Sequence, residues 1–505
     1  MKPFAIIAFG AACSLSACTV GPDYARPESL AALLGLDQAQ APEEFAAAPE
    51  SPAPALETLS AWWTRLGDPD LDPLVAEMLS GNRNIAAAAA RVQQAQAQFD
   101  NAGAALWPSL DLAPSASRSF TANAAGNRTY ANSYSVGTTL SWQTDLFGRL
   151  RSAENANAAS FAASEADWLG LIHTQIATLV RTRVALATLS RRLEATRAIA
   201  ESRRATLRAV ERRYRAGLEA TNAVDLRSAR ENYTSALADI PALENDLAAA
   251  TTALDLLLGR VPTAAQVAPN TLANVPPPRD VPLSVPAALL DRRPDLRAAE
   301  FRLMAATANV GVAIADLYPN LTLTGSLSST AASASNLFNA ATLAGSLAAQ
   351  IAQPLFDGGA RRATVRQREA AVDEQAALYA GAILTAFKEV EDALTAERKS
   401  GERLKQLDAT LKEVKLAEQS AFDRFRRGIG TYERLLETQR RLQTVEQTLL
   451  IEQQNKWNAR IDLILALGGD WFNEETPLTG VAPEGMPKAM PKAMPKAMNE
   501  GNRGS

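Results

Sequence analysis

Hydrophobic residues along the 505-residue chain follow two different periods, which predict two kinds of secondary structure. Between residues 72 and 105, apolar side chains such as Leu74, Met78 and Ile85 recur every three or four positions, a spacing that predicts an amphipathic helix. In residues 135–143, Val136, Thr138, Leu140 and Trp142 alternate with small or polar residues. This alternation predicts a strand with one apolar face and one polar face.

The alternating pattern returns in the second half of the chain. Residues 321–327 and 343–351 place Leu, Ile and Gly on one face and mostly Thr, Ser, Ala and Gln on the other. Strands of about ten such residues fit a transmembrane position between lipid and an aqueous lumen, and they equally fit a soluble sandwich with one buried face. The segments 121–134 and 328–341 are rich in Ala, Asn, Ser and Gly, which predicts exposed loops.

Long segments without proline follow each pair of strands. Residues 148–215 and 359–427 contain no proline, so each could form a helix of about 100 Å at a rise of 1.5 Å per residue. A glycine follows each segment, as is typical of a left-handed turn at the end of a helix. Candidate N-caps for returning helices come next, at Thr221 and Thr431. Each segment therefore predicts a long helical hairpin.

Short motifs recur in the same order at offsets of 209 to 211 residues. The pairs are Leu106-Trp107-Pro108 with Leu317-Tyr318-Pro319, Leu146-Phe147 with Leu355-Phe356, Tyr214-Arg215-Ala216-Gly217 with Phe425-Arg426-Arg427-Gly428, and Leu257-Leu258-Gly259 with Ala466-Leu467-Gly468. Four landmarks that keep one register indicate a duplicated structural unit.

The duplication divides the chain into two repeats with the same order of helix, β-hairpin and helical hairpin. The expected divisions are a signal peptide at 1–17, a leader at 18–58, repeat 1 at 59–260 (β-hairpin 108–146, helical hairpin 148–258), a Pro-rich linker at 261–286, repeat 2 at 287–470 (β-hairpin 319–356, helical hairpin 359–467) and a disordered low-complexity tail at 471–505.

One hairpin per repeat gives four strands per chain, too few to close a barrel. An open sheet edge cannot face lipid, because its backbone N–H and C=O groups would lack partners. If these strands cross a membrane, several chains must share one barrel, and twelve strands from three chains is a plausible closed number.

The N-terminus has the features of a lipoprotein signal peptide. Lys2 precedes an apolar run at residues 4–12 that is too short for a membrane span, and small residues then lead to Cys18. We expect cleavage before Cys18 and acylation of that residue, with the outer membrane as destination because Thr19 is not an aspartate. The alternative is an ordinary signal peptide with Cys18 incidental. Since Cys13 would be removed, no free thiol would remain for a disulfide.

Composition and motifs give no support for an enzyme. The formal net charge of −4 provides no basis for nucleic-acid binding. The one histidine, His173, falls in a helical segment and is expected to be a packing residue. No cluster with metal-ligand spacing, P-loop, Rossmann glycine pattern or nucleophile elbow is present in the sequence. We therefore expect no catalysis, no metal and no cofactor.

Together these features resemble the TolC-like outer membrane factors, specifically the lipoprotein subfamily found in RND-type tripartite efflux systems. The resemblance extends from Cys18 to about Trp471. It rests on Cys18-Thr19-Val20-Gly21-Pro22-Asp23-Tyr24, Trp62-Trp63, Asp68-Pro69 with Leu71, Leu106-Trp107-Pro108, Asp145-Leu146-Phe147-Gly148, Asp291-Arg292-Arg293-Pro294-Asp295-Leu296, Leu317-Tyr318-Pro319 and Pro354-Leu355-Phe356-Asp357-Gly358-Gly359.

The resemblance implies a fold that is mainly α with a transmembrane β-barrel. Three copies would form a twelve-strand barrel in the outer membrane and a twelve-helix tunnel in the periplasm. Such a homotrimer works with a periplasmic adaptor and an inner-membrane pump, and it expels drugs, toxic compounds or metals. No nucleic acid is involved.

The resemblance also implies roles for residues at the turns of the two helical hairpins. The gate candidates are Asp225, Glu437, Arg227, Arg434 and Tyr432, and the turn residues expected to contact the adaptor are Tyr214, Arg215, Gly217, Phe425, Arg426 and Gly428. Arg434 stands where some family members carry an acid, so a mixed Glu437/Arg434 network is expected. The alternative is that these charges are solvated, in pairs that contribute about 0–1 kcal/mol each.

Two rival classes share some of these features. A periplasmic adaptor lipoprotein also has a helical hairpin, and a structural coiled-coil lipoprotein of the envelope also has long helices. The duplication along the chain argues against the first, and the alternating strands argue against the second. The sequence does not indicate the exported substrate, the cognate pump or the resting state of the gate.

Overall fold

The computed structural model describes residues 20–26, 62–63, 68–122, 124, 126, 128–217, 222–263 and 293–468. The chain divides into two compact units. The sheet unit comprises Met1–Ala41, Ala90–Trp168 and Pro294–Leu384, and the hairpin unit comprises Pro42–Ala89, Leu169–Arg293 and Thr385–Ser505. The predicted signal peptide, Cys18, most of the leader and linker, and the C-terminal tail lie outside the described residues.

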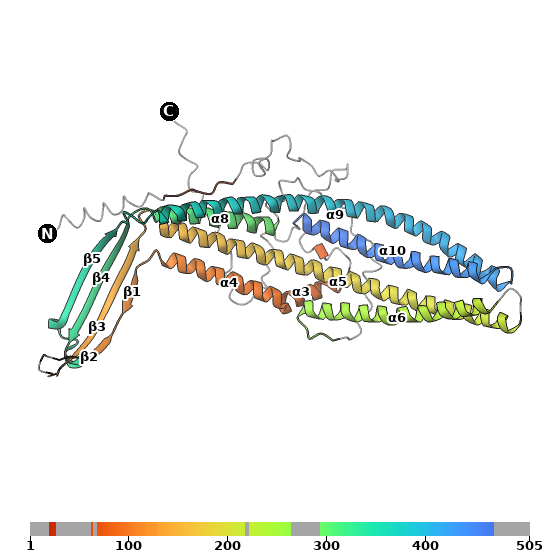
Figure 1. Ribbon diagram of the computed structural model, residues 1–505, viewed down its shortest axis with the longest axis horizontal. Helices are drawn as coiled ribbons and strands as arrows, with labels where there is room; N and C mark the ends of the chain where they lie inside the picture. Colours follow the sequence, from red (N-terminus) through yellow and green to blue (C-terminus); the bar gives the residue numbers. More distant parts are fainter. Residues whose placement is uncertain are drawn as a thin grey trace, which may run out of the picture. The chain divides into compact units, whose positions relative to one another are not determined.

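Helices predominate, and the elements follow one another in two similar series (Figure 1). The first series is α3 (Leu71–Gly81), α4 (Arg83–Ala104), β1 (Ser109–Leu112), β2 (Ser115–Ala122), β3 (Arg128–Thr144), α5 (Arg149–Arg215) and α6 (Ala223–Leu258). The second is α8 (Pro294–Ala315), β4 (Asn320–Ala331), the 3-10 helices η5 (Ala334–Asn336) and η6 (Ala340–Thr342), β5 (Leu343–Ala352), α9 (Ala360–Arg426) and α10 (Tyr432–Ala466).

The strands form one antiparallel sheet in the order β1-β3-β4-β5, with β2 also paired to β3. β1 and β2 are two parts of one arm, because both pair with β3 in the same register and Ala113 N–H donates to the Gly137 carbonyl between them at 2.9 Å. Pro114 interrupts the arm, since proline has no backbone N–H to give to a ladder. The described sheet therefore has four strand positions.

The register places the apolar side chains of all four positions on one face. Leu110 lies opposite Leu140, Trp142 opposite Leu323, and Leu321 opposite Ile351. The other face carries mainly Ser, Thr, Ala and Gln, together with Asp111. Two hydroxyl pairs bridge neighbouring strands there at 2.7 Å, Ser115 with Ser135 and Ser326 with Ser346. The apolar face is uncovered in the single chain: Leu347 is 86% exposed and Ile351 69% exposed.

The sheet extends further from the helices than the sequence predicted. Residues 128–134 were expected to lie in an exposed loop, but they form the first part of the 17-residue strand β3. Residues 328–331 likewise belong to β4. Both loop predictions were wrong at these positions because small polar residues, which resemble loop composition, here pair across strands.

The two repeats share hydrogen bonds as well as element order. Trp142 Nε1 donates to the Leu106 carbonyl at 3.0 Å, and Gln353 Nε2 donates to the Leu317 carbonyl at 3.1 Å. Donor and acceptor are each 211 positions apart between the repeats. The Leu-aromatic-Pro motifs thus have a structural role: the carbonyl of each leucine, just after a helix, accepts a hydrogen bond from a side chain at the end of a strand or just after it.

The described part of the leader, residues 20–26, is bound along the sheet unit. The Tyr24 hydroxyl donates to Glu300 on α8 at 3.1 Å, and Arg26 forms a salt bridge with the same carboxylate at 3.4 Å. Burial raises the pKa of Tyr24, with Glu300 adding to the effect. These contacts hold the described residues of the leader against α8.

The helix predicted from 72 to 105 is two helices separated by Asn82. The Asn82 side chain accepts hydrogen bonds from the backbone of Asn84 and Ile85 at 2.9 and 3.2 Å, which caps α4. Its amide donates to the Leu257 carbonyl at 2.9 Å. The break brings Gly81 against the end of α6, where a Cβ on Gly81 would lie 2.3 Å from the Leu258 carbonyl oxygen. Only glycine fits this approach.

A buried ion pair fastens the segment before α3 to α5 within the hairpin unit. The Asp68 carboxylate, 0% exposed, accepts from Arg183 Nε and Nη2 at 3.3 and 3.0 Å. Asp70 accepts from the same guanidinium at 3.1 Å but is 61% exposed. The Asp-Pro motif thus supplies a structural anchor.

His173 is buried on α5, as expected of a packing residue, and burial lowers its pKa to about 3. In the unfolded chain the imidazole titrates near pH 6.5, so below that pH the unfolded state binds a proton that the folded state does not. We predict that His173 lowers the free energy of unfolding by up to about 1.4 kcal/mol per pH unit as pH falls from about 6.5 toward 3. Urea unfolding of the wild type and His173→Gln between about pH 7 and pH 5 would measure this dependence. Equal pH slopes for both proteins would contradict it.

No described helix is long and apolar enough to cross a membrane. The described residues also contain no group of three His, Cys, Asp or Glu side chains able to hold a metal ion.

Candidate functional site: the turns of the two helical hairpins

Both long helices end in a glycine turn. α5 ends at Arg215 and α9 at Arg426, and the glycines that follow, Gly217 and Gly428, have φ angles of 64° and 83°. This left-handed conformation is costly for residues with a Cβ, so glycine is what allows the chain to reverse here.

The first returning helix, α6, is capped at Asn222 rather than at Thr221, which lies outside the described residues. The Asn222 side chain accepts from the backbone N–H groups of Val224 and Asp225 at 2.8 and 2.9 Å. In return, the Asp225 carboxylate accepts from the Asn222 N–H at 3.1 Å. This reciprocal capping box gives Asp225 a structural role in addition to any role in gating.

The second returning helix, α10, is capped by Thr431, whose hydroxyl accepts from the Arg434 N–H at 3.3 Å. One turn later, Glu437 forms salt bridges with Arg434 at 2.7 Å and with Arg441 at 3.8 Å. The structure thus brings Arg434 and Glu437 together on the exposed face of one helix. No hydrogen bond or salt bridge joins Asp225 to Glu437 in the described part of the chain.

An apolar cluster holds the ends of the two hairpins together. Its buried members come from all four helices: Val210 on α5, Ala229 on α6, Phe425 on α9, and Tyr432 and Leu435 on α10. Each helix contributes one or two side chains, so neither hairpin can bury this surface alone.

Phe425 was expected to contact a partner protein, but it is only 1% exposed. The guanidinium of Arg213 lies 4.1 Å from the centre of its ring, and Arg213 also donates to the Phe425 carbonyl. An arginine from the first hairpin therefore covers the second turn. Phe425 anchors that turn and presents no surface of its own.

A buried polar cluster lies beside the apolar one. Arg203, 7% exposed, donates to the Asn232 carbonyl at 2.9 Å and to the Gln443 side chain. Arg440 donates to Asn232 Oδ1 at 3.1 Å, and the Asn232 amide donates to the Tyr432 hydroxyl at 3.4 Å. These bonds connect α5, α6 and α10. Burial lowers the pKa of Arg203 and raises that of Tyr432.

The sequence analysis identified Tyr432 but missed Arg203, Asn232, Arg440 and Gln443. The sequence did contain a signal for Arg203. Ala200, Arg203, Thr206 and Val210 follow one another at helical spacing on one face of α5, and all four are buried. A charged residue on such a face indicates a buried partner.

The remaining candidates are accessible. Arg227 on α6 is exposed, as are Arg215, Gly217, Arg426 and Gly428 at the turns. Tyr214 is 43% exposed. These side chains and glycines are therefore accessible for contact with a partner protein.

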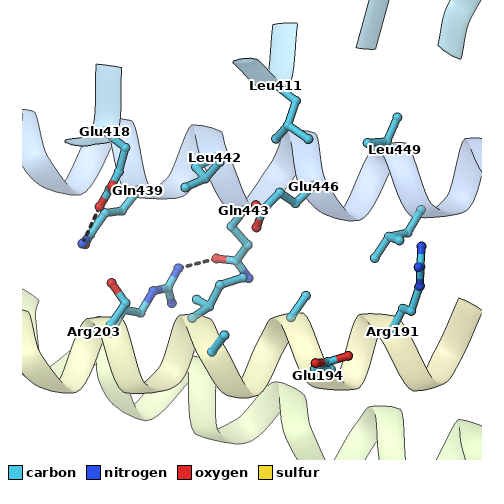
Figure 2. Close-up of a pocket in the computed structure, with 15 residues that line it drawn as sticks. Arg191, Glu194, Arg203, Leu411, Glu418, Gln439, Leu442, Gln443, Glu446 and Leu449 are labelled. Atoms are coloured by element: carbon cyan, nitrogen blue, oxygen red, sulfur yellow. Dashed lines mark hydrogen bonds between the residues drawn. The ribbon is translucent and has the colours of Figure 1, made fainter. Parts of the chain in front are cut away.

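A groove of about 590 Å³ runs beside the polar cluster, between α5 on one side and α9 and α10 on the other (Figure 2). Arg203 on α5 and Gln443 on α10 line this groove and are joined by a hydrogen bond. Gln439 on α10 also lines it and donates to Glu418 on α9 at 3.4 Å. Its wall combines leucines with charges of both signs. This composition suits a helix–helix contact rather than a site for one kind of ion.

The fold and these turns define a class of protein: a duplicated chain in which a four-position β-sheet continues into two long helical hairpins. The family model for outer membrane efflux proteins matches residues 74–260 and 285–469, one segment in each repeat. The chain belongs to the outer membrane efflux protein family.

Individual relatives match over nearly their whole length. Cation efflux system protein CusC of Escherichia coli is 29% identical over 480 residues, which cover 93% of this chain and 100% of CusC. Solvent efflux pump outer membrane protein SrpC of Pseudomonas putida is 32% identical over 462 residues, covering 90% of this chain and 96% of SrpC. The solved structure of the outer-membrane channel OprN superposes with a TM-score of 0.79 at 31% identity, covering 90% of this chain and 100% of OprN.

Proposed function

We propose that the protein is the outer membrane channel of a tripartite efflux system, which passively conducts small solutes from an inner-membrane pump and its periplasmic adaptor to the exterior. The observation that carries this proposal is the sheet: its apolar face is uncovered and both of its edges lack a partner strand in the described chain. Family membership supports the same assignment. The energy for export comes from the pump, and this chain catalyses no reaction.

Closure of the sheet requires other copies of the chain. The β1/β2 arm and β5 are the two edges, and in lipid their unpaired N–H and C=O groups would cost several kcal/mol each. Pairing β5 of one copy with the β1/β2 arm of the next generates a ring. Three copies with four strand positions each give a twelve-strand barrel, and α5, α6, α9 and α10 from each copy give a twelve-helix tunnel.

The location we propose is the outer membrane, with the helices in the periplasm and the mature chain acylated at Cys18. Acyl chains contribute about 0.8 kcal/mol to the free energy of membrane binding per buried methylene. The acyl anchor therefore adds to the membrane attachment that the barrel itself would provide.

The turns are the proposed contact with the adaptor. Tyr214, Arg215, Gly217, Arg426 and Gly428 are exposed and can form this contact. Phe425 supports it from beneath, because it fixes the second turn against Arg213.

The gate is proposed at the same end. Arg227, Arg434 and Glu437 present their charges to solvent there, whereas Asp225 also holds the start of α6 and Tyr432 is buried between the hairpins. We propose that Glu437 and its arginines line the opening, while Tyr432 helps to hold the two hairpins together through Asn232.

The substrate class stays open within this function. Relatives at similar identity include a cation efflux protein and a solvent efflux protein. The polar face of the sheet, which would line the lumen, carries mainly Ser, Thr, Ala and Gln, and Asp111 is its one carboxylate in the described strands.

Single-channel recording in planar bilayers tests the proposed function. Purified protein should give discrete conductance steps, because a closed barrel with a polar interior admits water and ions. A verified trimer that gives no steps would refute the channel and favour a structural or adaptor role.

We predict that Glu437→Gln shifts the reversal potential of the channel toward anions in a salt gradient. The substitution removes one negative charge per chain while Arg434 and Arg441 keep theirs, so each copy gains one positive unit at the opening. The unitary conductance should change less than the selectivity, because the partners of Glu437 lie on its own helix.

Asp408→Asn is the matched control, since Asp408 is an exposed carboxylate on α9, 18 residues before the end of that helix, with no salt bridge in the described residues. If both variants shift the reversal potential equally, the effect is one of overall charge and Glu437 does not line the opening.

A further inference from the structure

Charged residues are nearly absent from the sheet. Between Asp111 and Asp145, a stretch that contains β2 and β3, the charged residues are Arg118 and Arg128. Between Asp316 and Asp357, which enclose β4 and β5, there is none. The described strands thus carry Asp111 on β1, opposite Thr139 on the polar face, and two positive charges, Arg118 and Arg128, with no carboxylate between residues 112 and 144.

The two arginines and two aromatic residues form one continuous cluster, which we call the cation–aromatic ladder: Arg118, Phe120, Arg128 and Tyr130. Phe120 and Tyr130 are cross-strand partners with ring centres 6.0 Å apart. The Arg118 guanidinium lies 5.0 Å from the centre of the Tyr130 ring, and that of Arg128 lies 5.1 Å from the centre of the Phe120 ring. Each arginine therefore stacks on the ring carried by the other strand.

The ladder lies on the apolar face of the sheet. The register pairs Arg118 with Asn132 and Ala122 with Arg128, and alternation along β3 puts these residues on the same face as Leu140 and Trp142. Arg118 and Phe120 belong to β2, and Arg128 and Tyr130 belong to the first part of β3. β2 lies at the end of the sheet away from α8 and the start of α5 (Figure 1).

The distance along β3 fits a bilayer. Tyr130 and Trp142 are twelve residues apart on one face, or about 40 Å along the strand and about 30 Å along the membrane normal at a typical strand tilt. Aromatic residues flank the apolar band of such barrels at both interfaces. Trp142, next to the helices, then marks the inner interface, and the ladder marks the outer one.

The guanidinium groups of Arg118 and Arg128 have N–H donors available for a ligand. In the described part of the chain, no hydrogen bond or salt bridge uses the Arg118 or Arg128 side chain. Stacking on a ring occupies the face of a guanidinium and leaves its N–H edge available, and that edge matches phosphate oxygens in a bidentate geometry.

We propose that the cation–aromatic ladder is a binding site for the phosphate group of a lipid in the outer leaflet of the membrane. The inference rests on the proposed membrane insertion of the sheet. Phe120 and Tyr130, more than half exposed, contact the acyl and sugar part of the lipid, while Arg118 and Arg128 hold its phosphate. Lipid is favoured over a soluble anion because the ladder lies on the apolar face, not on the polar one.

Binding of bis-phosphorylated lipid A to the detergent-solubilised full-length protein, counted by native mass spectrometry, tests the proposal. Arg118→Gln/Arg128→Gln should weaken binding by about tenfold or more, as expected for lost charge-assisted hydrogen bonds. Lipid A without phosphates should bind the wild type as weakly as bis-phosphorylated lipid A binds the double variant. The control is Arg83→Gln/Arg91→Gln, which removes the same charge from exposed positions on α4.

Three results would overturn the assignment: equal binding with and without lipid phosphates, equal loss in the two double variants, or displacement of the lipid by inorganic phosphate at an equal concentration. Conductance of the same preparations separates this proposal from the channel itself. A double variant that conducts normally and keeps its lipid refutes only the ladder, whereas a wild type that never conducts refutes the proposed function.

Discussion

Asp68→Asn is expected to lower the free energy of unfolding by about 3–5 kcal/mol, the usual cost of removing one partner from a buried ion pair. The Arg183 side chain is 5% exposed and would keep its charge without the carboxylate that now accepts its Nε and Nη2 groups. Denaturant unfolding followed by far-UV circular dichroism measures the change.

Asp70→Asn is the matched control for this experiment. Asp70 contacts the same Arg183 Nη2 at nearly the same distance, 3.1 Å against 3.0 Å, but it is 61% exposed. Its replacement should cost about 1 kcal/mol or less. Similar losses in the two variants would show that burial of Asp68 does not set its importance.

Gly259→Ala is expected to be the other severely destabilising substitution, through two effects at one position. Gly259 ends α6 with φ at 75°, a conformation that costs a residue with a Cβ about 1–2 kcal/mol. The new Cβ would also lie 2.1 Å from the Gly81 carbonyl oxygen, a backbone atom that cannot rotate away. We expect a loss well above the strain alone, measured as a fall in the midpoint of thermal unfolding.

Gly217→Ala separates these two effects. Gly217 has a similar φ of 64°, yet nothing lies within 4 Å of the position of its Cβ. Its replacement should show the conformational strain without the clash. If Gly259→Ala costs no more than Gly217→Ala, then α3 and α6 can move apart and their contact is not rigid.

Helix lengths were predictable because the signals for them are local. Absence of proline and a glycine at the end were enough to predict α5 and α9, since both signals act on the backbone of the helix itself. The break at Asn82 was not predictable in this way. It exists because Gly81 must approach α6, some 175 residues away in the sequence, and the helical period of the apolar residues continues across it.

The far half of the β2–β3 hairpin was missed for a related reason. Its Ser, Ala, Asn and Thr residues have the composition of a loop, and their strand conformation depends on the partner strand. The candidate site was reached mainly through resemblance, which assigned Arg434, Glu437 and Tyr432 to the turns, and all three lie at the start of α10. Burial of Phe425 beneath Arg213 could not be inferred, because the covering side chain comes from the other repeat.

Pro114 has a consequence for how copies of this chain recognise one another. Since Ala113 directs its N–H toward β3, the next residue would direct its own N–H outward, to the free edge of the sheet. Proline has no such group, so the outer edge of the β1/β2 arm lacks one donor. In the proposed ring, one backbone carbonyl of the neighbouring β5 would therefore face Pro114 without a backbone donor.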